Sequence, residues 1–343
     1  MQIDVENPSS LVSYLRSTKR VAPEEMIASR VLVGGVSNKT VLVTRRMGDA
    51  WVIKQALPKL RTKIDWFSDP ARIHREALAL QYLPELAPAG TITPLVFEDR
   101  ENHILAMEAV PEPHENWKER LLSGRVEAHH MMQFGEILGT IQARSIARRD
   151  ELSAIFDDRQ YFESLRIEPY YAYTAQQVPE AAEFLYRLID TTRATRVALV
   201  HGDYSPKNIL VRNDRLILLD HEVIHWGDPA FDVGFALAHL LSKAHHLREY
   251  RDGFENGVVL FASACFSQVA DGEVTEDFRT RCAHHALACL LARVAGRSQM
   301  DYLSEGEKQT QRRAVVALMS NPPNDIVYVL EQFIRGIERH ADH

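Results

Sequence analysis

The sequence predicts an α+β protein in two unequal parts, a small antiparallel sheet followed by a larger, mainly helical region. Two observations support this prediction. Short apolar runs separated by turn residues dominate the first third of the chain, a pattern typical of strands. After Val110–Pro113, apolar residues recur at helical spacing over long segments. Because this junction contains two prolines and is stiff, we expect one domain over residues 1–110 and a second over 111–343.

Each expected element of the first domain has its own signal. Ser9 and Ser10 are candidate N-caps for a short helix over Leu11–Arg16. Pro70 suits the first turn of a longer helix, whose apolar spacing continues to Tyr82. The expected strands are apolar runs bounded by glycine, asparagine or charged residues, and they cover Ile27–Val33, Thr40–Thr44, Ala50–Gln55, Leu95–Glu98 and His103–Met107.

The second domain is expected to consist of helices around one polar loop with short strands on either side. The loop and its strands lie within Ala198–Leu219, and a helix late in the chain is expected to open at Gln311. The other helical segments keep their apolar residues three or four positions apart, and they cover His130–Arg144, Pro179–Asp190, Phe235–His245, Thr275–Arg293 and Asp325–Arg339.

The composition excludes several classes of protein. The 343 residues are 45% hydrophobic and 25% charged, which is close to the average of soluble globular proteins and unlike disordered or fibrous chains. The 40 Lys and Arg residues against 47 Asp and Glu give a net charge of −7, which disfavours a nucleic-acid partner. The three cysteines are widely spaced and form no C-x-x-C pair, so neither a disulfide framework nor a cysteine zinc site is expected.

The sequence also carries no signal for export or membrane insertion. No apolar run approaches the roughly 18 residues that a membrane span needs. The first residues are acidic and do not form a basic, then apolar, leader. We therefore expect a cytoplasmic protein without a membrane partner. The oligomeric state is left open.

A polar loop between two apolar runs carries the most informative residues. Asp203 and Asn208 lie five positions apart in this loop, after Ala198–Val200 and before Ile209–Val211. The next apolar run leads directly into Asp220. Because a strand delivers the residue at its end to the rim of a sheet or hairpin, we expect the three polar side chains to converge on one point.

These side chains suit phosphoryl transfer. Such a reaction uses a divalent metal ion that neutralises phosphate charge and prefers oxygen ligands. It also uses a carboxylate that accepts the proton of the attacking hydroxyl. Asp203 fits the proton acceptor, and Asn208 and Asp220 fit the metal ligands. Each residue alone would be more typical of an ordinary polar turn, so the prediction depends on their joint spacing.

The pattern H-G-D-x-x-x-x-N over 201–208, followed by D-x-E over 220–222, resembles the catalytic core of the aminoglycoside phosphotransferase and choline kinase group. These small-molecule kinases include the methylthioribose kinases. The resemblance implies a bilobal protein-kinase-like fold, ATP as the phosphate donor and Mg2+ as the metal, with Glu222 as a further metal contact. It also implies that His201 and Asp232, the latter in a G-D-P-x-x-D stretch, support the catalytic loop.

The same resemblance assigns roles in the first domain. Lys54 ends a short apolar strand and would orient the phosphates of ATP, and Glu76 on the following helix would hold it in place. The turn over 34–38 contains Gly35, Ser37 and Asn38, whose backbone amides would cradle phosphates. Its two adjacent glycines differ from the pattern G-x-G-x-x-G, so the turn alone is a weak signal.

The last strand of the first domain would lead into the segment that binds adenine. By resemblance, Met107 would lie beside the purine, and backbone groups from Glu108 to Val110 would hydrogen-bond it. The motifs thus follow one another in the order that this fold requires, from the glycine turn through the catalytic loop. The resemblance is specific around the catalytic loop and looser elsewhere.

The acceptor is expected to be a small hydroxylated molecule such as a sugar, an amino alcohol or an antibiotic. Tyr170 and Tyr171 lie in an aromatic stretch that suits either contact with this acceptor or packing of the core. Arg312 and Arg313 match arginine pairs that help form the substrate site of methylthioribose kinases. An arginine pair also suits a solvated helix face, and both alternatives stay open.

Two other functions fit part of the pattern. A nucleotide-binding pseudokinase with a regulatory role would keep the same fold without turnover, although every core position of the motif is occupied here. A metal-dependent phosphohydrolase would use Asp203 and Asp220 on simple phosphate esters. That second function leaves Lys54 and Glu76 without a role.

Overall fold

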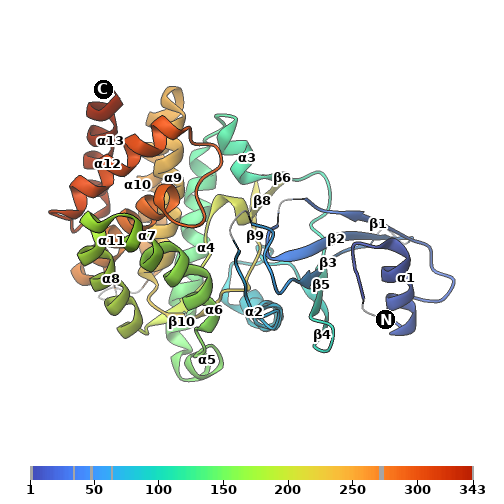
Figure 1. The fold of residues 1–343 in the computed structure, drawn as a ribbon. Helices are drawn as coiled ribbons and strands as arrows, with labels where there is room; N and C mark the ends of the chain where they lie inside the picture. Colours follow the sequence, from blue (N-terminus) through green and yellow to red (C-terminus); the bar gives the residue numbers. More distant parts are fainter. Residues whose placement is uncertain (1–2, 34, 47–48, 63–64, 270–273, 342–343) are drawn as a thin grey trace.

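The computed structural model describes residues 3–33, 35–46, 49–62, 65–269 and 274–341, and it has two lobes (Figure 1). The N-terminal lobe contains a five-stranded sheet in the order β1-β2-β3-β5-β4, and all neighbouring strands are antiparallel. The C-terminal lobe is mainly helical, so the α+β prediction is confirmed. The strands of the sheet are β1 (Ile27–Val31), β2 (Asn38–Arg45), β3 (Ala50–Ala56), β4 (Leu95–Asp99) and β5 (Ile104–Glu108).

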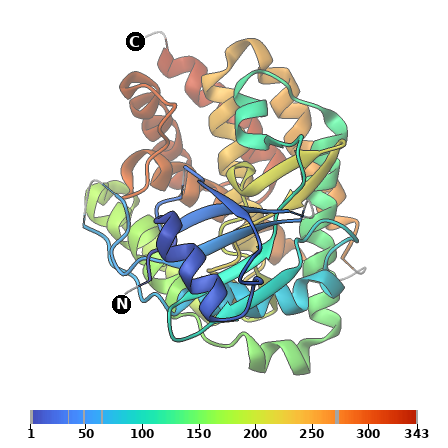
Figure 2. The ribbon, with the colours of Figure 1, turned by 90° about the vertical axis from the view of Figure 1, so that its right-hand side faces the viewer.

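Two helices, α1 (Pro8–Ser17) and α2 (Arg72–Leu86), pack on opposite faces of this sheet; α1 lies in front of it in Figure 2. Side chains of a strand alternate between its two faces. On β5, Ile104 and Ala106 accordingly pack with α1, whereas Leu105 packs with α2. This alternation decides which residues of the neighbouring strand β3 reach the α2 side.

The C-terminal lobe is built around α9 (Ala230–His246), which is buried along nearly its whole length. The three cysteines are buried and unpaired in this lobe, as expected. Within the described part of the chain, no helix is both long and apolar enough to cross a membrane. The other helices are α3 (Trp117–Leu122), α4 (Ala128–Ala147), α5 (Arg149–Ile155), α6 (Gln160–Phe162), α7 (Tyr173–Gln177), α8 (Ala182–Ala194), α10 (Arg251–Phe266), α11 (Glu276–Ala295), α12 (Glu305–Met319) and α13 (Ile326–Ala341).

Short strands and tight helical turns complete this lobe. The strands are β6 (Glu115–Asn116), β7 (Ala198–Val200), β8 (Ile209–Arg212), β9 (Arg215–Leu218) and β10 (His225–Gly227). The turns are η2 (Pro179–Ala181), η3 (Pro206–Asn208) and η4 (Arg248–Tyr250). β8 and β9 form a hairpin. The polar residues of the predicted site lie directly before and shortly after this hairpin in the chain.

The starts of two helices differ from the sequence-based expectation. Ser9 and Ser10 were expected to cap α1, but Asn7 does so by accepting the N–H of Ser10 at 3.0 Å. The helix begins earlier than expected because Pro8 occupies the first helical position. α12 begins well before Gln311, because Ser304 starts it with a capping box. The signature of that box, serine followed three positions later by glutamate, is visible in the sequence and would have located the true start.

An unexpected π-helix, η1 (Glu163–Ala172), covers the aromatic stretch before the loop over residues 201–208, which the sequence predicts to be the catalytic loop. The N–H of Tyr173 bonds to the carbonyl of Glu168, five residues back, and Pro169 lies inside the helix without an N–H to donate. π-helical turns are rare and frequently occur at functional sites. η1 presents Arg166 and Tyr170 to the residues that surround the catalytic loop.

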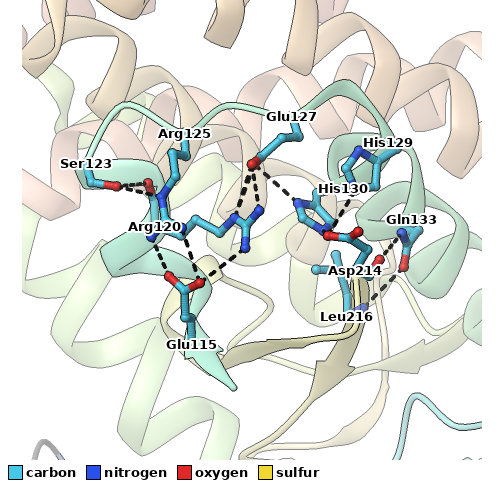
Figure 3. Close-up of polar contacts among 10 residues, drawn as sticks. All are labelled: Glu115, Arg120, Ser123, Arg125, Glu127, His129, His130, Gln133, Asp214 and Leu216. Carbon is cyan, nitrogen blue, oxygen red and sulfur yellow. Dashed lines mark hydrogen bonds and ion pairs between the residues drawn. The ribbon is translucent and has the colours of Figure 1, made fainter. Parts of the chain in front are cut away.

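The β8–β9 hairpin is anchored to the helical lobe at its turn (Figure 3). Gln133 of α4 donates from Nε2 to the carbonyl of Asp214 at 2.8 Å and accepts the N–H of Leu216 at 3.2 Å. The other end of the hairpin carries Asn208, directly before β8, and Asp220, shortly after β9. The anchor therefore fixes the two strands that position these polar side chains.

The buried ring of His225 makes the stability of the fold depend on pH. It stacks on Phe162 with ring centroids 4.1 Å apart, and burial lowers its pKa to about 3. In the unfolded chain the same ring takes up a proton at about pH 6.5. The folded state therefore loses stability as the pH falls below 6.5, by about 1.4 kcal/mol per pH unit.

We expect His225→Gln to weaken this pH dependence. Urea titrations at pH 7 and pH 5 measure the free energy of unfolding, and the loss between them should be smaller in the variant than in the wild type. His129→Gln is the control, because the side chain of His129 is 46% exposed. Equal losses in His225→Gln and the wild type would mean that the folded protein protonates His225 readily.

Candidate active site

Lys54 contacts two carboxylates between the lobes. It lies on β3, on the face of the sheet that packs against α2. Its Nζ is 2.7 Å from Oε1 of Glu76 on α2 and 2.9 Å from Oδ1 of Asp220 after β9. Burial alone would lower the pKa of Lys54, but the negative charges of Asp220 and Glu76 outweigh it and raise that pKa. The pairing of Lys54 with Glu76 that the sequence predicts is present.

Asp220 is held in an unusual backbone conformation. Its φ is 68°, in the left-handed region that residues other than glycine seldom adopt. The neighbouring Leu219 donates its N–H to the carbonyl of Asn208 at 2.9 Å, which joins the two ends of the hairpin. Burial would raise the pKa of Asp220, but the charge of Lys54 outweighs it and lowers the pKa, so this carboxylate is ionised at neutral pH. Strain of this kind often occurs at functional sites.

Asp232 holds the start of the loop over residues 201–208 through two hydrogen bonds to its backbone. Its two carboxylate oxygens accept the backbone N–H groups of His201 at 2.6 Å and Gly202 at 2.8 Å. Gly202 has φ 78°, a conformation that favours glycine. Burial raises the pKa of Asp232 to about 7, against the lowering effect of these two hydrogen bonds. These contacts are the ones expected of a supporting residue.

The loop brings Asp203 and Asn208 together. Asn208 donates from Nδ2 to the carboxylate of Asp203 at 2.8 Å and to its backbone carbonyl at 2.9 Å. His201 supports the turn, because its Nδ1 lies 3.2 Å from the N–H of Asp203. Among the hydrogen bonds of the described residues, the side-chain oxygen of Asn208 accepts none. The structure thus places Asp203, Asn208 and Asp220 around the ends of one hairpin, as their spacing predicts.

Arg166 of η1 is a partner of Asp203 that the sequence-based prediction missed. Its Nη2 lies 3.0 Å from Oδ1 of Asp203, and its Nε donates to the carbonyl of Gly202 at 2.6 Å. Burial would raise the pKa of Asp203, but the charges of Arg166 and Lys207 outweigh it and lower the pKa. No motif contains Arg166, although it lies one helical turn before the aromatic residues that the sequence singled out.

Glu222 connects the glycine turn to α2. Its Oε2 accepts hydrogen bonds from Nε of Arg72 at 3.2 Å and from Nδ2 of Asn38 at 3.1 Å. Arg72 is fully buried and also donates to the carbonyls of Ser37 and Leu57. One oxygen of Glu222 therefore already has cationic and amide partners, and a metal contact through its other oxygen stays a prediction. Arg72 was also missed, although it lies four positions before Glu76 and thus on the same face of α2.

The glycine turn and the adenine segment are described in part. Gly34 lies outside the described residues, and a Cβ on Gly35 would make only ordinary contacts of 3.9 Å. At the end of β5, Glu108 donates its N–H to the carbonyl of Pro94 at 2.9 Å, so this amide is not free for a ligand. Among the hydrogen bonds of the described residues, the N–H of Val110 has no acceptor.

Met107 lies between the sheet and α2. It is 3% exposed and belongs to a cluster of apolar side chains that includes Ala77 and Leu105. The hydroxyl of Thr93 donates to its Sδ at 3.5 Å. Met107 thus borders the same space between sheet and helix into which Lys54 projects.

The residues expected at the acceptor fall into two groups. Tyr170 is buried near the catalytic loop, where its hydroxyl accepts a hydrogen bond from Arg293 at 3.1 Å. Tyr171 is fully buried, and its hydroxyl contacts His285 at 2.7 Å, so packing of the core is its role. Arg312 and Arg313 are exposed on α12, which favours the solvated helix face over a contact with the acceptor.

Comparison with known proteins assigns the chain to a family. Residues 29–259, more than half of the chain, match the phosphotransferase enzyme family. Methylthioribose kinase of Pectobacterium carotovorum subsp. carotovorum (strain PC1) is 26% identical over 264 residues, which are 67% of this chain and 64% of the relative. Methylthioribose kinase 2 of Oryza sativa subsp. japonica is 26% identical over 267 residues, 68% of this chain and 62% of the relative. The chain thus spans less than two-thirds of the length of these curated relatives.

Solved structures show the same architecture over nearly the whole chain. A choline/ethanolamine kinase family protein from Mesorhizobium loti superposes with a TM-score of 0.57 at 15% identity and covers 96% of this chain and 99% of its own. The amicoumacin kinase hAmiN superposes with a TM-score of 0.58 at 11% identity, over 88% of this chain and 91% of its own. At these identities the likeness concerns the fold, and it confirms the protein-kinase-like architecture. With the family match over residues 29–259, the chain belongs to the phosphotransferase enzyme family.

Proposed function

We propose that this protein transfers the γ-phosphate of ATP to a hydroxyl group of a small molecule. The observation that carries the proposal is the placement of Asp203 and Asn208 beside the contact between Asp220 and Lys54. Membership of the phosphotransferase enzyme family and the likeness to methylthioribose kinases support it. A proton acceptor, oxygen ligands for a metal and a cation for phosphates are the parts that phosphoryl transfer needs.

The donor set suits a hard divalent cation such as Mg2+. The carboxylate of Asp220 and the amide oxygen of Asn208 are oxygen ligands, and one carboxylate oxygen of Glu76 is buried without a hydrogen-bond partner. When bound, the metal ion would neutralise charge on the phosphates of ATP. Lys54, held by Glu76, would bind those phosphates, and catalysis would consist mainly of positioning and charge neutralisation.

Asp203 would orient the acceptor hydroxyl and take its proton. Because Arg166 lowers the pKa of Asp203, this carboxylate is ionised at neutral pH and is a weak base. A weak base suits a transfer in which the hydroxyl loses its proton late, after bond formation to phosphorus has advanced. Orientation of the hydroxyl is then the larger part of its role.

The nucleotide would bind between the lobes. The free N–H of Val110 is the donor best placed to hydrogen-bond adenine at the end of β5, and the turn that contains Gly35, Ser37 and Asn38 would cover the phosphates. We assign nucleotide binding to residues 1–110 and the chemistry and acceptor binding to residues 111–343. Dependence on ATP agrees with the cytoplasmic location that the sequence favours.

Two measurements test the proposal. Mg2+ with ATP should raise the thermal unfolding midpoint, and ADP should be released when a panel of sugars, amino alcohols and aminoglycosides is supplied. Water can replace the acceptor, so we also expect slow ADP release without any acceptor. Stabilisation by ATP without ADP release under either condition would favour the pseudokinase alternative. Phosphate release from simple esters without ATP would instead favour a phosphohydrolase.

A further inference from the structure

A buried lysine near the catalytic loop has no acidic partner. Lys243 of α9 is fully buried, and its Nζ donates to the carbonyl of His239, one turn earlier in the same helix, at 3.2 Å. Within the described ranges of the chain, no carboxylate forms an ion pair with Lys243. Its Nζ instead lies 5.2 Å from the ring centre of Tyr302. Burial lowers the pKa of Lys243 to about 7, and the charges of Lys118 and Arg293 add to this effect.

Other cationic side chains converge on the same place from separate elements. Nζ of Lys118 on α3 lies 5.9 Å from the ring centre of Tyr302, the same ring that Nζ of Lys243 approaches. The charges of Arg293, Lys243, Lys207 and Lys118 act on the ring of His239, where they add to burial in lowering its pKa. We call the cationic side chains of this group the basic cluster, and its members are Lys118, Arg166, Lys207, Lys243 and Arg293.

The basic cluster is continuous with Asp203. The guanidinium of Arg166, which pairs with Asp203, lies 5.6 Å from the ring centre of Tyr170. Arg293 of α11 lies 5.8 Å from the centre of the same ring and donates to its hydroxyl at 3.1 Å. Tyr170 therefore has two guanidinium groups within 6 Å of its ring centre. Nε of Arg293 is buried without a hydrogen-bond partner, so this side chain has a donor to spare.

Few negative charges balance these cations. Asp203 is shared by Arg166 and Lys207. Asp301 pairs with Lys118 at 3.0 Å, but its side chain is 77% exposed and is screened by solvent. A buried ammonium without a partner is costly to the folded state, and a pKa of about 7 leaves Lys243 only partly protonated at neutral pH. An anion bound beside Lys243 would favour its charged form. The same arrangement would repel a polycationic aminoglycoside or an amino alcohol.

We infer that the acceptor is an anionic hydroxylated molecule, whose carboxylate or phosphate group binds Lys243 and Arg293 while its hydroxyl faces Asp203. This inference rests on the proposed function and adds the class of acceptor to it. Arginine binds planar or tetrahedral oxyanions through paired donors, and lysine supplies a point charge. The two donors lie on α9 and α11, so the anion would also fix the acceptor relative to the catalytic loop.

Matched pairs of acceptors test the inference. Glycerate against glycerol, gluconate against glucose, and ribose 5-phosphate against ribose differ in negative charge and share hydroxyl groups. Choline adds a cationic alcohol. We expect ADP release with the anionic member of at least one pair, with a kcat/KM about 10- to 100-fold above its neutral partner. The carboxylate and phosphate pairs distinguish the two anionic groups.

Lys243→Met and Arg293→Met should each lower the kcat/KM for the anionic acceptor by about 10- to 100-fold and so remove its advantage over the neutral partner. Arg312→Met is the matched control, because it removes a positive charge from the exposed face of α12. Methionine matches the volume of lysine and removes an unpaired buried charge, so Lys243→Met should fold at least as stably as the wild type. Higher stability together with weaker anion binding is a combination that a purely structural Lys243 would not produce.

Three outcomes would contradict the inference. Neutral or cationic acceptors could be phosphorylated as efficiently as the anionic ones, or Arg312→Met could change the preference as much as Lys243→Met. If no acceptor releases ADP, inorganic phosphate in the presence of Mg2+ and ADP should still stabilise the wild type more than Lys243→Met, and equal stabilisation would overturn the inference. Slow ADP release without acceptor reports on the proposed function separately, because it does not require an anionic acceptor.

Discussion

Replacing Asp203 by asparagine is expected to lower kcat by about a thousandfold while leaving the binding of ATP intact. The amide keeps the shape of the side chain and can still accept the hydrogen bond from Asn208, but it cannot take the proton of the acceptor hydroxyl. Nucleotide binding should survive, because Lys54 and Asp220 lie on other elements. ADP release at saturating ATP measures kcat, and the ATP-induced shift of the unfolding midpoint measures binding.

Asp214→Asn provides the control for this experiment. Asp214 lies on the same hairpin at its far turn, and its side chain is 74% exposed. The same chemical change there should leave kcat within about twofold of the wild type, since exposed substitutions have small effects. Wild-type turnover by Asp203→Asn would mean that another group accepts the proton, and the proposed role of Asp203 would be wrong.

The sequence predicts the residues of one continuous loop well, because their spacing is local. Asp203 and Asn208 are five positions apart, and Asp220 follows the next strand. A hairpin brings such positions together whatever surrounds them. The pairing of Lys54 with Glu76 was also predictable, because the resemblance to small-molecule kinases implies a strand lysine held by a glutamate on the following helix.

The partners of this loop could not be predicted in the same way. Arg166, Lys243 and Arg293 lie on three different helices, and each one by itself resembles a solvated surface charge in the sequence. Only the tertiary packing buries Arg166 and Lys243 and brings them near the half-buried Arg293. Arg312 shows the converse, because the sequence left it open between a substrate contact and a solvated helix face, and the fold leaves its side chain exposed.

Replacing Lys54 by methionine is expected to lower both stability and turnover. The variant leaves Glu76, which is fully buried, and Asp220 without the cation that lies between them. Removing one partner of a buried ion pair costs about 3 to 5 kcal/mol. Burial already raises the pKa of Glu76 to about 7, and loss of the cation raises it further. Because the unfolded glutamate releases its proton at about pH 4.3, the variant loses more stability as the pH rises through this raised pKa.

The double variant Lys54→Met/Glu76→Gln separates the structural role of this pair from its catalytic role. Glutamine removes the buried charge and keeps an oxygen that can accept the N–H of His221, which lies 3.4 Å from Oε1 of Glu76. Most of the lost stability should return, and the added pH dependence should disappear in urea titrations at pH 6 and pH 8. Turnover should stay at least about a hundredfold below the wild type, because no cation remains to position the phosphates of ATP. A double variant that regained both stability and ADP release would show that Lys54 only balances the charge of its two carboxylates.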